Sequence, residues 1–222
     1  MRPIVTPWLP MGRIGKSVSL VLASVILVTG VFIYAKTRMP QLSEDELRER
    51  GVFILPRPTE IDPFLLEDDS DDGFSNADFI GKWSFLFFGF THCPDVCPTS
   101  MAEMGKAMAV LGEAQREARH PFQGVLISVD PYRDTPEQVI AYAQAFASSF
   151  TGATGSRPAL TELSQQVNVA FNRVPDGQNG LTVEHTGNIV IINPHGQYCG
   201  LIKLPHRAET IRLTYQSLAA RF

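Results

Sequence analysis

The most informative absence in this sequence is that of a basic cluster. Residues 39–222 contain 14 lysines and arginines against 23 aspartates and glutamates, a net charge of −9. Aromatic and basic residues are not interleaved there either, so we expect no nucleic-acid partner. The chain also lacks internal repeats. Its 44% hydrophobic and 19% charged residues are typical of a globular protein rather than a disordered one.

A second absence excludes a calcium-binding loop. The acidic segment "EDDSDDG", residues 67–73, would need an acid six positions after its glycine, but that position is Phe79. The segment lies between two stretches that contain apolar residues, and we therefore predict a solvated hairpin turn.

Charged residues are also absent from Ser17 to Ala35. As a helix this run would span about 28 Å, close to the hydrocarbon thickness of a bilayer. We predict a transmembrane anchor, because a buried helix of a soluble domain normally keeps a polar face. Removal as a signal peptide is the alternative. The length of the run and the lack of a small-x-small cleavage pattern disfavour it.

The predicted anchor divides the chain into four parts. These are a short N-terminal tail (1–16), the anchor (17–35), a linker (36–51) and a main domain (52–222). Basic residues flank the anchor almost equally, so the orientation is taken from the short tail and the large C-terminal domain. The tail leaves no room for a mitochondrial presequence. We expect a single-pass protein of a bacterial inner membrane with its C-terminal domain in the periplasm.

Buried strands and capped helices alternate in the main domain. Continuous apolar runs predict strands over Ser84–Phe90 and Phe122–Asp130, and helices are expected from Pro98 and from Pro136. A shorter helix over residues 159–167, a hairpin formed by "NIVIIN" and "CGLIKL", and a closing helix from His206 complete the pattern. This order predicts an α/β sandwich with a mixed central sheet and helices on both faces.

Two of the three cysteines lie in "FFGFTHCPDVCPTS", at the junction between a buried strand and a helix. Cys93 and Cys97 are four residues apart, so their sulfurs face the same way in a helical or turn-like start. Amides at a helix N-terminus favour thiolates, which are both nucleophiles and metal ligands. The motif alone therefore fits a redox pair or a metal site.

A missing proline separates these two possibilities. Redox proteins with a thioredoxin-like fold usually place a proline opposite the cysteine pair, before the strand that opens the closing hairpin. No proline lies between Leu181 and Ile192, and His185 stands there instead. Two thiolates and an imidazole suit copper, because soft sulfur holds Cu(I) and nitrogen allows Cu(II). A structural zinc ion would normally need a fourth ligand.

Three segments together resemble the Sco/SenC family of membrane-anchored copper proteins: "FGFTHCPDVCP", "SVDPYRDTPE" and "VEHTGNIVIINPHG". The resemblance covers most of residues 52–222. It implies a thioredoxin-like fold with an inserted hairpin, and copper held by Cys93, Cys97 and His185. It also implies a role in building the dinuclear copper centre of cytochrome c oxidase.

One local departure from the family pattern is visible. The family often has aspartate before its ligand histidine and small hydroxyl residues after it, whereas this chain has Glu184 before it and Thr186 and Gly187 after it. An acid is retained, so we expect His185 to remain a ligand.

Two functions follow from these observations. The first is a copper metallochaperone, a transfer protein rather than an enzyme. It would deliver copper to the copper-binding subunit of cytochrome c oxidase; its own copper donor is not indicated. The alternative is a thiol–disulfide oxidoreductase that uses Cys93 and Cys97 to reduce the copper-ligand cysteines of that subunit or of another periplasmic protein. His185 distinguishes them, because disulfide exchange does not require it.

The remaining candidate residues have simpler interpretations. His92 is expected to point away from the cysteines, as the neighbour of a residue at a strand end does. Cys199 is expected to be a small apolar residue in a strand. Asp130 and Asp134 fall at the same sheet edge as the cysteines if the two strands are parallel. They either shape a partner surface or cap the turn.

Overall fold

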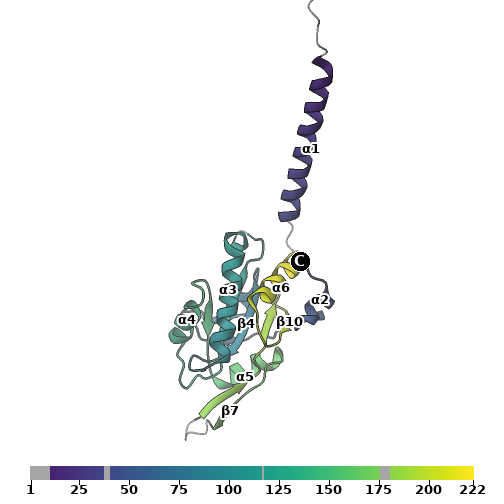
Figure 1. Cartoon of the computed structure of the whole chain (residues 1–222). Helices are drawn as coiled ribbons and strands as arrows, with labels where there is room; N and C mark the ends of the chain where they lie inside the picture. The colour runs from purple at the N-terminus through teal and green to yellow at the C-terminus, as the bar shows by residue number, and fades with distance from the viewer. Residues whose placement is uncertain (1–10, 38–40, 117, 176–180) are drawn as a thin grey trace, which may run out of the picture. The chain divides into compact units, whose positions relative to one another are not determined.

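A computed structural model describes residues 11–37, 41–116, 118–175 and 181–222 (Figure 1). The chain separates into two compact units, residues 1–40 and 41–222. In the first unit, Met11–Thr37 forms helix α1. Within the described residues, no helix combines the length and the apolar character needed to cross a membrane. The anchor expected over residues 17–35 is therefore not supported by the structure.

The second unit starts at Gln41, inside the segment expected to be a linker. Its first helix, α2 (Glu44–Glu49), begins with a capping box in which the Ser43 hydroxyl and the Glu46 carboxylate satisfy each other's backbone amides. Leu47 of this helix is completely buried in the core. The chain then enters strand β1, Val52–Thr59.

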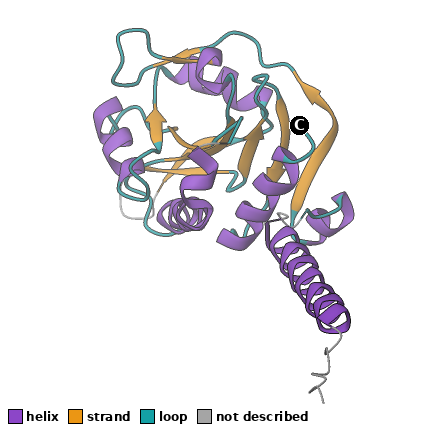
Figure 2. Cartoon of the chain, turned by 90° about the horizontal axis from the view of Figure 1, so that it is seen from above, coloured by secondary structure: helices purple, strands orange, loops and turns teal. Residues whose placement is uncertain are grey.

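The second unit is built on a six-stranded sheet in the order β1-β10-β9-β4-β5-β6. Figure 2 shows its strands in orange with helices in purple around them. β4 pairs in parallel with β5 and β5 with β6, while β1, β10, β9 and β4 pair antiparallel. The predicted mixed sheet is confirmed. Every residue of β4 is buried, so both faces of the sheet are covered at its centre. The strands are β4 (Trp83–Gly89), β5 (Phe122–Ser128), β6 (Thr151–Ala153), β9 (Ile189–Ile192) and β10 (Tyr198–Ile202).

Four helices follow the strands in the expected order. The Thr135 hydroxyl caps α4 and Gln138 completes its capping box, as predicted. α3 begins two residues before Pro98, which places Cys97 in its first turn. α3 packs against β4, β5 and α6, and α4 packs against β5 and β6. The helices are α3 (Val96–Arg116), α4 (Pro136–Gln144), α5 (Arg157–Gln166) and α6 (Ala208–Ala219).

Two short antiparallel pairs lie outside the central sheet. β2 (Leu65–Leu66) pairs with β3 (Phe74–Ser75) across the acidic turn, which confirms the predicted hairpin turn, and the 3-10 helix Asn76–Phe79 follows. β7 (Phe171–Pro175) pairs with β8 (Leu181–His185) between α5 and β9. This second hairpin ends at His185 and so positions the histidine of the candidate site.

Candidate metal centre

The two cysteines follow directly from the carboxyl end of β4. Cys93 lies in the loop after this strand, and its amide donates to the Phe90 carbonyl at 3.3 Å. Cys97 lies in the first turn of α3, and its amide donates to the Cys93 sulfur at 3.5 Å. Cys97 is fully buried while Cys93 is partly exposed. The pair therefore has one sulfur within reach of a partner and one held in the core.

His185 reaches the cysteines from the β7–β8 hairpin. Its Nε2 lies 3.6 Å from the Cys97 sulfur, and its Nδ1 lies 3.2 Å from the Thr186 carbonyl oxygen. A carbonyl only accepts, so Nδ1 carries the proton and Nε2 keeps its lone pair, which faces the sulfur. The rings of Phe87 and Phe90 meet the imidazole edge to face and fix its plane.

The structure brings all three predicted site residues together. The two sulfurs and one imidazole nitrogen lie within 4.8 Å of one another, and no other such group of histidine, cysteine or acidic side chains occurs among the described residues. Two soft sulfurs and one nitrogen fit copper, with Cu(I) favoured by sulfur and Cu(II) tolerated through nitrogen. The hydrogen bond from Nδ1 to the Thr186 carbonyl is the kind of contact that orients a metal-ligating histidine.

Burial determines the protonation states of Cys97 and His185 in the donor group. Burial raises the pKa of the Cys97 thiol far above its ordinary value, and the neighbouring Cys93 side chain adds to this. Burial lowers the pKa of His185, although its bond to the Thr186 carbonyl opposes this. At neutral pH without metal, Cys97 is a neutral thiol and His185 a neutral imidazole. A metal ion that binds here must displace the Cys97 proton.

Asp134 anchors the start of the cysteine loop. Its carboxylate accepts from the Thr91 amide at 2.8 Å, from the Thr91 hydroxyl at 2.6 Å and from the Ser128 hydroxyl at 2.6 Å. His92 Nδ1 lies 3.3 Å from the same carboxylate, so this ring is engaged away from the sulfurs as expected. Asp130 and Asp134 are both buried. Of the two interpretations left open, a partner surface is wrong.

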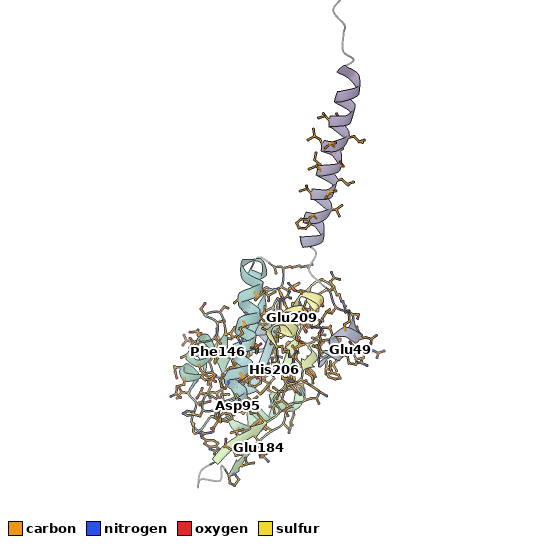
Figure 3. All side chains as sticks on the ribbon, in the orientation of Figure 1. Glu49, Asp95, Phe146, Glu184, His206 and Glu209 are labelled. Atoms are coloured by element: carbon orange, nitrogen blue, oxygen red, sulfur yellow. The ribbon has the colours of Figure 1, made fainter. Side chains whose placement is uncertain are left out.

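A shallow groove gives access to the partly exposed sulfur. It has a volume of about 500 Å³, and Leu204, on its wall, is 48% exposed. Asp95 and Glu184 lie on its rim at the same end of the second unit (Figure 3). Its lining is otherwise mostly apolar and includes Phe90, Pro94, Val96, Val183 and Leu204. An incoming side chain can therefore approach Cys93 without entering the core.

The third cysteine takes no part in the group. Cys199 lies in β10, is 4% exposed and donates from its sulfur to the Ile191 carbonyl at 3.4 Å. Burial raises the pKa of this thiol to about 12. The prediction of a packed strand residue is confirmed.

The fold and the three side chains define a class: a thioredoxin-like α/β protein with a Cys-Cys-His donor group beside the carboxyl end of a central strand. The SCO1/SenC family model matches residues 55–220. The chain belongs to the SCO1/SenC family.

Individual relatives agree with this assignment. A protein of Stutzerimonas stutzeri named for copper binding is 35% identical over 177 residues, which is 78% of this chain and 85% of that protein. The human mitochondrial SCO1 homolog is 30% identical over 174 residues, again 78% of this chain but only 55% of the human protein. The chain thus matches about half of the length of the human relative.

Solved structures show the same fold. Apo Sco1 of Thermus thermophilus has a TM-score of 0.66 and 31% identity, over 76% of this chain and 96% of that one. Arabidopsis thaliana ScoI with copper bound has a TM-score of 0.65 and 26% identity, over 72% of this chain and 98% of that one. Copper binding is therefore established within the family to which this chain belongs.

We predict that Gly89→Ala disturbs the buried sulfur. A Cβ atom on Gly89 would lie 2.9 Å from the Cys97 sulfur, closer than real Cβ contacts come, and 3.0 Å from the Phe87 ring, which is also unusually tight. Overpacking of this kind typically costs about 1–3 kcal/mol. Urea unfolding measures the loss. In a Cys97→Ala background the same change should cost less, because one of the two clashes is gone; an equal cost in both backgrounds would contradict this contact.

We predict that copper(I) affinity rises with pH throughout the neutral range. The raised pKa of Cys97 means that a proton competes there, which changes affinity by about tenfold per pH unit for each proton displaced. The lowered pKa of His185 confines its competition to values below the ordinary histidine pKa of about 6.5. Competition titrations with a Cu(I) chelator measure both effects. The additional acid dependence should vanish in His185→Ala, and an affinity independent of pH would refute thiolate binding.

Proposed function

We propose that this protein is a copper metallochaperone that binds one copper ion through Cys93, Cys97 and His185. It delivers the ion to the dinuclear copper site of cytochrome c oxidase during assembly. One observation carries the proposal: donor atoms from two separate segments converge within 4.8 Å, with the imidazole lone pair directed at the buried sulfur. The copper-bound structure of a 26% identical relative supports it.

The three ligands have different roles in this proposal. The buried Cys97 is the ligand that a partner reaches last, and the partly exposed Cys93 is the one that a partner's ligand displaces first. The two thiolates hold Cu(I) in near-linear geometry, and His185 adds the nitrogen that Cu(II) prefers. Copper is thus retained by the core ligand while exchange begins at the groove.

The partner in this proposal is the copper-binding subunit of the oxidase. The groove beside Cys93 admits a side chain, and its rim carries the acidic Asp95 and Glu184. The surrounding residues 39–222 have a net charge of −9. Both features favour a partner loop that carries positive charge around its own copper ligands.

Substitution of each ligand tests the proposed site. Cys93→Ser or Cys97→Ser should abolish tight Cu(I) binding, because a hydroxyl is hard and largely protonated where a soft thiolate is needed. His185→Ala should weaken Cu(I) binding but preserve it, and should lose or strongly alter the Cu(II) spectrum. Copper stoichiometry, Cu(I) competition and Cu(II) absorption spectra measure these effects.

Cys199→Ala is the matched control for the loss of a cysteine. This residue is buried outside the donor group, so its removal should leave one copper bound per chain. If His185→Ala left both oxidation states of copper and oxidase assembly unchanged, the three-ligand site would be wrong.

A second function, thiol–disulfide exchange, is favoured by the unequal burial of the two sulfurs. In this reaction the Cys93 thiolate attacks a disulfide of the target and forms a mixed disulfide, releasing one target thiolate. The Cys97 sulfur, after losing its proton, then attacks Cys93. This releases the second target thiol and leaves an oxidised Cys93–Cys97 pair, which an external dithiol must reduce. His185→Ala should retain this activity, so the same variant separates the two functions.

We also propose that residues 41–222 lie outside the cytoplasm, in the periplasm of a bacterium. The support is the charge-free run Ser17–Ala35 ahead of a large C-terminal unit. An alkaline phosphatase fused after Phe222 should be active, because that enzyme requires the oxidising periplasm. An active cytoplasmic reporter at the same position would place the unit inside the cell.

A further inference from the structure

The loop between β5 and α4 contacts both halves of the donor group. On one side, Asp134 holds Thr91 at the start of the cysteine loop through its amide and hydroxyl. On the other side, Asp130 faces Arg173 of strand β7, in the hairpin that carries His185. Arg133, in the same loop, lies over the Phe90 ring at 5.6 Å, and Phe90 packs against His185. One short segment therefore contacts both parts of the chain that supply ligands.

The ion pair between the loop and the hairpin involves a fully buried carboxylate. Asp130 is 0% exposed, and its Oδ2 accepts from the Arg133 side chain. Its Oδ1 lies 3.7 Å from Arg173 Nη2 and has no hydrogen bond. The Arg173 guanidinium also stacks on the Tyr132 ring, 4.3 Å from its centroid. Arg173 is thus fixed both by charge and by an aromatic face, each from the loop 130–134.

Strand pairing transmits this contact to the histidine. Arg173 lies opposite Val183 in the β7–β8 register, and Phe171 lies opposite His185 itself. A shift of Arg173 therefore moves the strand that ends at the imidazole. Asp130 is packed in the interior and cannot move with Arg173, so such a shift would break the ion pair between them. Removal of Arg173 would leave Oδ1 of the buried Asp130 carboxylate without this cationic neighbour, while Arg133 still pairs with Oδ2.

We propose that Arg173 and Asp130 are positioning residues that hold the β7–β8 hairpin so that His185 Nε2 stays beside the sulfurs. Together with the Asp134–Thr91 contact, they let one loop set the separation between imidazole and thiols. The proposal rests on the proposed use of His185 as a copper ligand. The motif "SVDPYRDTPE", which contains Asp130 and Asp134, would then support the donor group from inside the protein and would not form a partner-binding surface.

Four single variants of the full-length chain, and the double variant of Arg173→Ala with Asp130→Asn, test this proposal. Arg173→Ala removes both contacts of the guanidinium, and Arg173→Lys retains the charge. Asp130→Asn removes the charge of the buried carboxylate with little change of shape. Arg157→Ala, at the exposed start of α5, removes the same charge as Arg173→Ala on a different element and is the matched control.

The first measurement uses the metal-free protein. Nitrogen NMR of His185 reports its tautomer, and amide exchange of residues 171–174 and 182–185 reports the hold on the hairpin. Arg173→Ala and Asp130→Asn should mix the tautomers of His185 and should accelerate exchange in the hairpin but not in β4. The effects should be non-additive in the double variant, because both act through one contact. Arg173→Lys should recover part of the parent behaviour, and Arg157→Ala should equal the parent.

The second measurement is copper binding. Loss of a residue that orients a ligand lowers metal affinity by about tenfold or more. Arg173→Ala should therefore weaken Cu(II) binding by about that factor and shift the Cu(II) spectrum towards that of His185→Ala. Its Cu(I) affinity should change little, since two thiolates suffice for Cu(I).

The two measurements distinguish a failure of this proposal from a failure of the proposed function. If His185→Ala loses Cu(II) but Arg173→Ala matches the parent in exchange, tautomer and spectrum, the positioning role is refuted while the copper site stands. If the hairpin responds as expected but His185→Ala leaves copper binding unchanged, the positioning role stands and the copper site is refuted. Faster exchange in β4 as well as in the hairpin would show general destabilisation and would overturn the proposal.

Discussion

The site depends on the antiparallel pairing of β9 with β4. β4 leaves the sheet at Gly89, and its partner β9 begins opposite that end, with Ile189 facing Phe87. Residues just after β4 therefore meet residues just before β9 at one edge of the sheet. This is how Cys97 and His185, 88 positions apart in the chain, come within 3.6 Å. Every residue of both strands is buried, so a slip of either strand would disrupt the packing on both faces of the sheet. The packed core therefore fixes the site together with the fold.

The same burial that fixes the geometry also sets the chemistry. A buried thiolate or imidazolium would be costly, so the metal-free group is held neutral, with the pKa of Cys97 raised and that of His185 lowered. Neutral imidazole with its proton on Nδ1 is already in the form that binds metal, while the Cys97 thiol is not. Copper binding therefore depends chiefly on the removal of a thiol proton. The imidazole is thus in its metal-binding form before any metal is present.

Much of this arrangement could be predicted from the sequence, for identifiable reasons. The continuous apolar runs predicted the buried strands β4 and β5, and Thr135 and Pro136 predicted the start of α4. The missing proline indicated His185 as a candidate ligand. The resemblance implied an inserted hairpin, but the sequence did not locate β7 and β8, because each strand has only five residues and the first ends in a proline. The hold of Asp134 on Thr91 joins residues 43 positions apart, and no local pattern signals it. Such contacts are long-range in sequence and become visible only in the folded chain.

The unequal burial of the two sulfurs explains why copper transfer and disulfide exchange are both compatible with one site. Each reaction needs one sulfur that a partner can reach and a second sulfur that stays inside the protein and reacts or binds after the first. Cys93 is partly exposed and Cys97 is buried, so they fit these two roles. Only the imidazole distinguishes the reactions, because it contributes a ligand and has no role in sulfur exchange. The contacts that hold His185, from the Phe87 and Phe90 rings to the hairpin that carries it, are superfluous for a redox pair. These contacts hold a neutral imidazole whose unprotonated Nε2 faces the Cys97 sulfur. This feature favours copper binding over disulfide exchange alone.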